Sequence, residues 1–193
     1  IAGAGRTTDT VSGVGSSLTF NGWSDYVDVG SAPSILPSGD KTVSLWMKPN
    51  ETATKVLVSA YIDSSNKFTL GYSDTVHGVF FQVDDGGSTY LQDSDNNLGM
   101  RNWTHAAATY TQFDNSIVVY IDGKVATTTL GSQVVTHPNG GGVRIAGRGG
   151  YNDMFFLGLL DDVRIYGQAL GVSEIQQLYA EGAKTGKISQ EGN

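Results

Sequence analysis

The chain has 193 residues, and its 12 Lys and Arg against 19 Asp and Glu give a net charge of −7 at pH 7. This acidic balance argues against sequence-independent nucleic-acid binding, which depends on Lys and Arg replacing phosphate counterions. The absence of cysteine excludes disulfide bonds and thiolate metal sites. No apolar run approaches the ~20 residues that span a bilayer, so we expect no membrane partner.

Residues 1–15 are small and polar and rich in glycine, which predicts a linker or a loosely held first strand. The length that follows suits one well-buried domain, which we place at residues 16–182. Residues 183–193 are predicted to be a tail or a linker.

Short alternating runs separated by turn residues predict an all-β domain. From Thr42 to Lys48 apolar and polar side chains alternate with the period of two that a strand with unlike faces requires. Further strands are predicted at residues 17–20, 26–29, 56–62, 68–72, 79–83, 90–92, 103–110, 117–121, 125–130, 143–146 and 155–166. Asn21-Gly22 and Asp122-Gly123 are typical turn pairs, and the latter predicts a two-residue hairpin. Strands at such regular spacing indicate a sandwich or a barrel.

One helix is predicted near the C-terminus. Gly171 can serve as its N-cap, and Glu174 can bond back to the cap. Ile175 and Tyr179 fall on one face, which we expect to pack on the sandwich. Gly182 stands where the helix is expected to end.

Six segments in order carry a resemblance to a known family: SLTFNGWSDYVDVG, TVSLWMKP, NWTHAAATY, VVYIDGK, VRIAG and GLLDDVRIYGQALGVSEIQQLY. Over residues 17 to 181 the chain resembles the laminin-G-like or concanavalin A-like jelly-roll domains. The resemblance implies a two-sheet antiparallel β-sandwich (jelly roll) with one short C-terminal helix. Trp46 and Trp103 resemble the packing tryptophans of that family, so both are expected in the core.

Carboxylates suited to catalysis are scarce. A retaining glycoside hydrolase needs two of them ~5 Å apart. The glutamates are Glu51, Glu174, Glu181 and Glu191, and none lies in a predicted mid-chain strand. Asp161 and Asp162 are adjacent in a strand and should point to opposite faces, so we do not expect them to form an acid/base pair. The sequence therefore predicts no enzyme.

The resemblance implies a structural calcium ion that joins the first strand pair to the last strand. Calcium takes carboxylate and backbone carbonyl oxygens. The expected ligands are Asp161, Asn21, Gly22 and Asp25. The structural alternative is that Asp162 forms an ion pair with Arg164.

Candidate ligand-binding residues gather in the loop of residues 148–153. Sugars are held by aromatic rings and by planar polar groups, and the loop supplies Arg148, Tyr151, Asn152 and Asp153. Arg101, His77 and Tyr90 are supporting candidates on other segments. The alternative is an ordinary solvated hairpin loop.

The resemblance, together with the lack of an acid/base pair, implies a non-catalytic carbohydrate-binding module that binds a polysaccharide or oligosaccharide. We expect it to be secreted or at the cell surface of a bacterium, tethered to a polysaccharide-degrading enzyme in a longer chain. The alternative is an adhesion or protein-interaction domain of a cell-surface protein. Whether the glycan is neutral or acidic stays open at this point.

Overall fold

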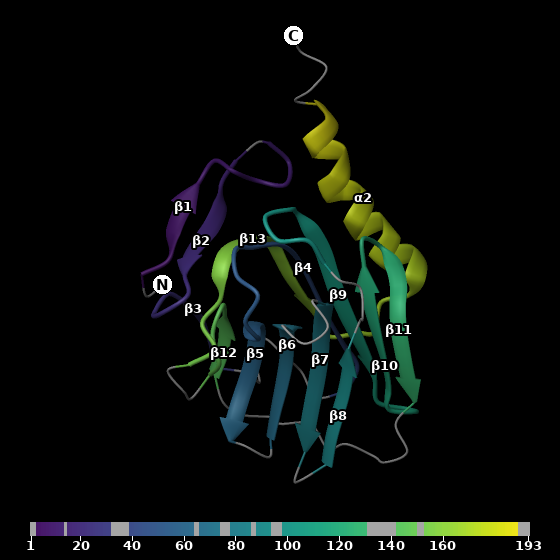
Figure 1. Ribbon diagram of the computed structural model, residues 1–193. Helices are drawn as coiled ribbons and strands as arrows, with labels where there is room; N and C mark the ends of the chain where they lie inside the picture. The colour runs from purple at the N-terminus through teal and green to yellow at the C-terminus, as the bar shows by residue number, and fades with distance from the viewer. Residues whose placement is uncertain are drawn as a thin grey trace.

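The computed structural model describes residues 3–13, 15–31, 39–63, 66–73, 78–85, 88–93, 98–130, 142–149 and 153–188. Two antiparallel β-sheets are stacked face to face, and a helix lies against one side of the stack (Figure 1). The seven-stranded sheet has the order β1-β2-β13-β4-β9-β10-β11, and the six-stranded sheet has the order β3-β12-β5-β6-β7-β8. The expected two-sheet antiparallel β-sandwich is confirmed.

Every strand predicted from the sequence is present, with ends that differ from the prediction by at most two residues. The strands are β1 (Gly5–Thr7), β2 (Ser17–Asn21), β3 (Val27–Ser31), β4 (Lys41–Pro49), β5 (Lys55–Asp63), β6 (Asn66–Ser73), β7 (Gly78–Asp85), β8 (Ser88–Asp93), β9 (Thr104–Thr111), β10 (Ser116–Ile121), β11 (Lys124–Leu130), β12 (Gly142–Ile145) and β13 (Leu157–Tyr166). The helix α2 spans Val172–Ile188. No helix in the described ranges combines the length and the apolar character that a membrane crossing needs. The domain limits at residues 16 and 182 stay predictions.

The core lies between the two sheets and follows the alternation read from the sequence. Val43, Leu45 and Met47 of β4 are completely buried. Leu70 and Phe81 of the six-stranded sheet belong to the same apolar cluster. Burying each such side chain contributes about 1.5–3 kcal/mol, which makes this layer the main source of stability.

The last strand, β13, occupies an inner position of the seven-stranded sheet. Leu160 of β13 pairs with Leu18 of β2 on one side and with Met47 of β4 on the other. The N-terminal strands β1 and β2 are therefore joined to the rest of their sheet through β13. β2 and β3 are consecutive in sequence but belong to different sheets, so the turn of residues 21–25 crosses from one sheet to the other.

The predicted hairpin at Asp122-Gly123 is confirmed. The two residues join β10 to β11 with positive φ angles of 49° and 73°, which a tight two-residue turn requires. A Cβ at Gly123 would lie 3.1 Å from Tyr179 of α2, so the hairpin tip and the helix approach closely.

The helix begins as predicted, because the Gly171 N–H donates to Glu174 Oε2 at 2.8 Å. Ile175 is completely buried beside Ala107 of β9 and Tyr120 of β10, so the apolar face packs on the seven-stranded sheet as expected (Figure 1). The predicted end at Gly182 is wrong, since α2 continues to Ile188. Gly182 does not end the helix. It lets the helix approach the Trp46 ring of β4 closely, because a Cβ at this position would clash with that ring.

The two tryptophans expected in the core have different environments. Trp46 is buried, and its ring stacks on Tyr179 of α2 at 5.5 Å between centroids. Trp103 is only half-buried and donates its indole N–H to Asp9 Oδ1 at 3.1 Å. The core assignment of Trp103 is wrong because its ring lies on the outward face of the seven-stranded sheet, beside Asp9 and Lys48.

Candidate functional site

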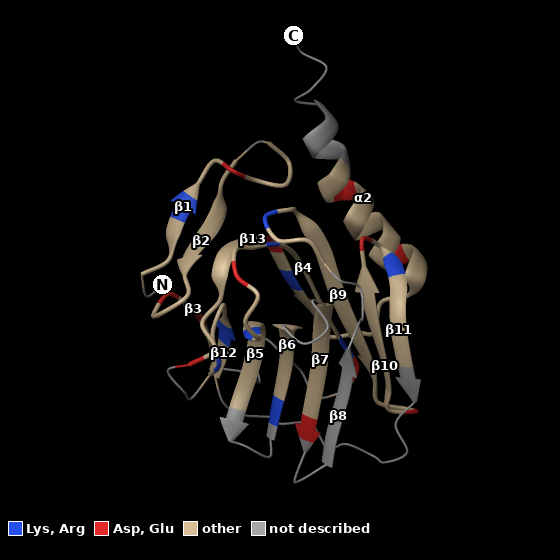
Figure 2. Cartoon of the chain, in the orientation of Figure 1, with Lys and Arg blue, Asp and Glu red and all other residues tan. Residues whose placement is uncertain are grey.

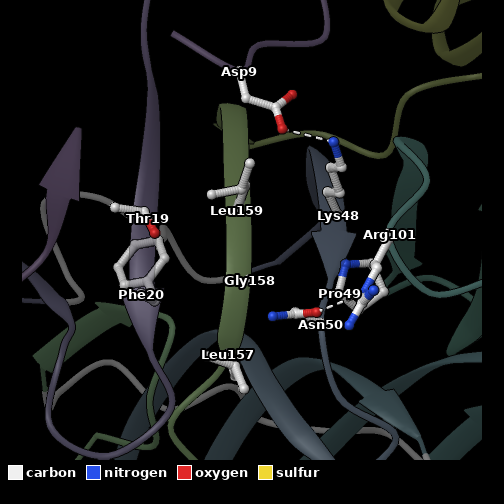
Figure 3. Close-up of a pocket in the computed structure, with 10 residues that line it drawn as sticks. All are labelled: Asp9, Thr19, Phe20, Lys48, Pro49, Asn50, Arg101, Leu157, Gly158 and Leu159. Atoms are coloured by element: carbon white, nitrogen blue, oxygen red, sulfur yellow. Dashed lines mark hydrogen bonds and ion pairs between the residues drawn. The ribbon is translucent and has the colours of Figure 1, made fainter. Parts of the chain in front are cut away.

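An open hollow of about 360 Å³ lies on the outward face of the seven-stranded sheet (Figure 3). Its lining residues come from β2, β13, the end of β4 and three loops, and they are Asp9, Thr19, Phe20, Lys48, Pro49, Asn50, Arg101, Leu157, Gly158 and Leu159. We call it the outer hollow. It brings together residues from both ends of the sequence because β13 is inserted between β2 and β4.

The floor of the outer hollow follows from strand alternation. Leu159 pairs with Thr19 and with Lys48, so these three side chains share one face of the sheet. Their neighbour Leu160 points the other way into the core. Gly158 has a φ of 149° and packs against the Lys48 carbonyl so closely that a Cβ would clash. The result is a shallow floor with exposed aliphatic carbon and a polar border.

One border of the outer hollow is an ion pair. Lys48 Nζ lies 2.6 Å from Asp9 Oδ2, and the Trp103 indole N–H donates to Asp9 Oδ1. Lys48 Nζ is also 6.0 Å from the centre of the Trp103 ring. The hydrogen bond from Lys48, opposed by partial burial and aided by Trp103, lowers the pKa of Asp9. Asp9 is therefore ionised at neutral pH.

Arg101 lies on the β4 side of the outer hollow, next to Asn50, and is held in place by its surroundings (Figure 3). Its backbone has a φ of 64°, a left-handed conformation that costs about 1–2 kcal/mol for a residue other than glycine. The Arg101 N–H donates to the Pro49 carbonyl at 2.8 Å, and Nε donates to Asn50 Oδ1 at 3.0 Å. These two bonds fix an exposed guanidinium group at the border (Figure 3).

The described residues at the two ends of the predicted binding loop, Arg148, Gly149 and Asp153, form contacts within the protein. Arg148 donates from Nε to Asp153 Oδ1 at 2.9 Å and from Nη2 to Asp153 Oδ2. The Gly149 N–H donates to Ser59 Oγ, and Ser59 Oγ donates to the Gly147 carbonyl. The charges of Arg148 and Asp153 thus pair with each other, which lowers their availability for a ligand.

With this geometry in view, the family can be assigned. A family model described as the concanavalin A-like lectin/glucanases superfamily matches residues 20–176. The chain belongs to this superfamily. The resemblance read from the six sequence segments is confirmed, whereas no curated protein sequence matches the chain.

Solved structures of similar fold include several binding domains. Domain 4 of AbnA, a GH43 extracellular arabinanase from Geobacillus stearothermophilus in complex with arabinotriose, has a TM-score of 0.73 at 20% identity over 91% of this chain and 81% of that one. The CBM40 of the Ruminococcus gnavus IT-sialidase bound to alpha2,3 sialyllactose has a TM-score of 0.74 at 14% identity, over 84% and 96%. The binding domain of Paraclostridial Mosquitocidal Protein 1 has a TM-score of 0.74 at 18% identity, over 93% of this chain and 46% of that one. At these identities the likeness concerns the fold.

Within this superfamily fold, the predicted ligand-binding residues do not form one site in the described part of the chain. Arg101 lines the outer hollow, whereas Arg148 and Asp153 do not. Tyr90 pairs in register with Val83 on the far edge of the six-stranded sheet, and its side chain lies outside the described residues. His77, Tyr151 and Asn152 also lie outside the described residues.

Sequence reasoning missed Asp9, Lys48 and Trp103 as site residues. Asp9 lies in a segment that looked like a linker, and Trp103 was assigned to the core. Trp23 was also overlooked, although its side chain is 83% exposed at the tip of the turn at residues 21–25. A tryptophan flanked by Asn, Gly, Ser and Asp is a local signal of exposure that could have identified it.

The four predicted calcium ligands do not converge. Asn21 pairs with Leu157, whereas Asp161 lies four positions further along β13, about 13 Å away at ~3.3 Å per residue. Asn21 Oδ1 accepts the N–H groups of Trp23, Ser24 and Asp25, and Asp25 Oδ2 accepts the Asn21 N–H. The turn that includes Gly22 is thus closed by its own hydrogen bonds. No group of three or more His, Asp or Glu suited to a metal occurs in the described ranges.

Asp161 lies instead beside the N-terminal segment. Its Oδ2 accepts the Val11 N–H at 3.3 Å, and its Oδ1 accepts the Asp162 N–H at 2.9 Å. Burial is the main reason why the pKa of Asp161 is raised. A second hollow of about 400 Å³ is lined here by Val11, Ser12, Gly15, Ser16, Asp161, Asp162, Arg164, Glu181 and Gly182.

The expectation that Asp161 and Asp162 face opposite sides is wrong. A β-bulge between Asp161 and Arg164, with a φ of 48° at Asp162, breaks the alternation, and both aspartates line the second hollow. The structural alternative for Asp162 is observed, since its Oδ1 lies 2.8 Å from Arg164 Nε.

Proposed function

We propose that this domain is a non-catalytic carbohydrate-binding module that binds a polysaccharide, attached to a secreted bacterial polysaccharide-degrading enzyme. The outer hollow is the observation that carries the proposal. Its floor offers aliphatic carbon from Leu157 and Leu159, and its border offers the amide of Asn50, the guanidinium of Arg101 and the ammonium of Lys48. This combination suits a sugar, which presents C–H faces and pairs of hydroxyl groups.

The fold supports the same proposal. Two of the similar structures hold arabinotriose and sialyllactose, and they are domains of an extracellular arabinanase and of a sialidase. Attachment to an enzyme and secretion are proposed for this chain by analogy with those proteins.

The charges in the outer hollow support binding without catalysis. Asp9 is the carboxylate among its described lining residues, and a retaining hydrolase needs a second one ~5 Å away. Asp9 is also a poor general acid because Lys48 and Trp103 stabilise its ionised form.

Exposed apolar side chains in the described part of the chain come from separate segments. They are Trp23, Val29, Met100, Phe113, Val125 and Val172. An adhesion surface would favour a contiguous apolar patch with a polar rim. The outer hollow therefore favours the carbohydrate proposal over the adhesion alternative.

Glycan-array binding followed by affinity gel electrophoresis tests the proposed function. We expect retention on at least one glycan, and we expect Asn50→Ala to weaken it because Asn50 borders the outer hollow and positions Arg101. Gln176→Ala, on the exposed face of α2, is the control that should retain binding. A folded wild-type protein that binds no glycan would contradict the proposal.

We propose further that calcium binds at the second hollow and not at the turn. Asp161 supports this position because it is partly buried next to the N-terminal segment that contributes Val11, Ser12, Gly15 and Ser16 to the hollow. Backbone and hydroxyl oxygens of that segment would complete an oxygen ligand set, and the ion would fasten the segment to β13.

A further inference from the structure

We propose that the outer hollow selects acidic sugars, whose carboxylate it binds through Arg101 and Lys48, and that Asp9 competes with the ligand for Lys48. This inference rests on the proposed function and names the class of glycan. Three features of the outer hollow carry it: its local charge, the unpaired donors of Arg101, and the carboxylate already bound by Lys48.

The outer hollow has the opposite charge balance to the whole chain. Acidic residues outnumber basic ones by 19 to 12, and charged residues are spread over both sheets and α2 (Figure 2). The lining of the outer hollow nevertheless contains two cations, Lys48 and Arg101, and one carboxylate, Asp9. A neutral glycan needs no such local excess of positive charge, whereas a carboxylated sugar is attracted by it.

Arg101 has donors available for a carboxylate. Nε is bonded to Asn50, but neither Nη1 nor Nη2 has a partner within the described part of the chain. A guanidinium group presents parallel N–H groups that match the two oxygens of a carboxylate. The bonds to Pro49 and Asn50 hold this group at the border before any ligand arrives, which lowers the entropic cost of binding.

Lys48 and Trp103 show that this border accepts a carboxylate. Each donates to one oxygen of Asp9, at 2.6 Å and 3.1 Å. The Asp9 side chain is 45% exposed, so solvent and a ligand can reach it. A ligand carboxylate that approaches Lys48 must share the ammonium group with Asp9 or replace it. Asp9 therefore lowers the affinity for acidic sugars.

Isothermal titration with trigalacturonic acid and with its fully methyl-esterified form tests the inference, because esterification removes the negative charges of the ligand and keeps its sugar rings. We expect the acid to bind wild type about tenfold or more tightly than the ester, the effect of one charge-assisted contact. Arg101→Gln should remove most of this difference. Asp9→Asn should strengthen binding of the acid several-fold and leave the ester unchanged.

Two controls separate binding from folding. Arg6→Gln removes an exposed cation on β1, away from the outer hollow, and should leave both affinities unchanged. The melting temperature of each variant shows whether it is folded. If Asp9→Asn does not fold, Lys48→Gln is measured in its place. Lys48→Gln should weaken binding of the acid and leave binding of the ester unchanged.

The outcomes distinguish the inference from the proposed function. Equal binding of acid and ester, or binding of neutral glycans alone, would overturn the acidic selectivity and leave the proposed function intact. Absence of binding to any glycan would overturn both. Weaker binding of the acid by a folded Asp9→Asn variant would show that Asp9 contributes to ligand binding. That result would contradict the proposal that Asp9 competes with the ligand carboxylate for Lys48.

Discussion

A buried histidine, His105, lies beneath α2 and is expected to make the stability of the domain depend on pH. His105 is 1% exposed, and its Nε2 lies 2.9 Å from Ser44 Oγ. Its ring lies 5.4 Å from the Trp46 ring, and Nδ1 is buried without a hydrogen-bond partner. Burial is the main reason why the pKa of His105 is lowered to about 4. The charge of Asp162 opposes this shift, and the charge of Arg164 adds to it. A second proton on this ring would be buried without an acceptor.

We predict that the free energy of unfolding falls as the pH is lowered from about 6.5 to about 4. In this window the unfolded state, with a normal histidine pKa, binds a proton that the folded state excludes. The contribution of His105 to the free energy of unfolding is fully present above the unfolded-state pKa. It decreases by about 3 kcal/mol across the window, at 1.36 kcal/mol per pKa unit. Urea unfolding at several pH values measures the effect. His105→Gln isolates it from the carboxylates, and an unchanged pH slope in this variant would contradict the assignment.

Gly182 shows a different residue-scale effect, in which a helix glycine is required for packing. A Cβ at this position would lie 2.7 Å from Trp46 Cε2, too close for real atoms. In an exposed helix Gly→Ala stabilises by about 0.5–1 kcal/mol. Here we expect Gly182→Ala to destabilise by about 1–3 kcal/mol because the helix or the indole must move. Thermal unfolding should therefore show a lower melting temperature, with Gln176→Ala as a near-neutral control on α2. A higher melting temperature for Gly182→Ala would show that the helix and the Trp46 ring can move apart at little cost.

At the scale of elements, the proposed calcium ion would join β13 to the N-terminal segment that contributes Val11, Ser12, Gly15 and Ser16 to the second hollow. We predict that millimolar calcium raises the melting temperature by several degrees over chelator, because a ligand at about 100 times its Kd stabilises by about 2.7 kcal/mol. Asp161→Asn should abolish this response. Asp25→Asn should retain it, since Asp25 bonds within its own turn. Equal melting temperatures with calcium and with chelator would exclude the site. Loss of the calcium response in Asp25→Asn but not in Asp161→Asn would show that calcium binds at the turn of residues 21–25.

The strands and the helix start could be predicted because their signals are local. Alternation from Thr42 to Lys48, the Asp122-Gly123 turn and the Glu174 cap each depend on neighbours within a few residues. The bulge after Asp161 could not be predicted, because it arises where β13 pairs with β4 and leaves no mark in the alternation itself. The half-buried position of Trp103 depends in the same way on tertiary contacts, because it lies beside Asp9 and Lys48, which are distant in the sequence.

On the scale of the whole molecule, the outer hollow could not be predicted because it has no local pattern. Its residues come from positions 9, 19–20, 48–50, 101 and 157–159, and they meet only through the strand order. Arg101 was the one member selected from the sequence as a ligand candidate. The loop at residues 148–153 had the better local composition, but the ion pair of Arg148 with Asp153 turns its charges toward each other.

The strand order also predicts which C-terminal element, β13 or α2, is required for folding. β13 is the link between β2 and β4, whereas α2 covers the outside of the same sheet. We predict that a chain ending at Gln168, without α2, still folds but loses on the order of 5 kcal/mol, because Leu170, Ile175 and Leu178 no longer bury apolar surface. A chain ending at Phe156 should not fold, since β1 and β2 then pair only with each other and lose their link to β4, and Leu160 leaves the core. Near-ultraviolet circular dichroism and urea unfolding compare the two chains with the full chain. A cooperative transition in the shorter chain would show that β2 can pair with β4 directly, and that the inserted position of β13 is not required for the sandwich.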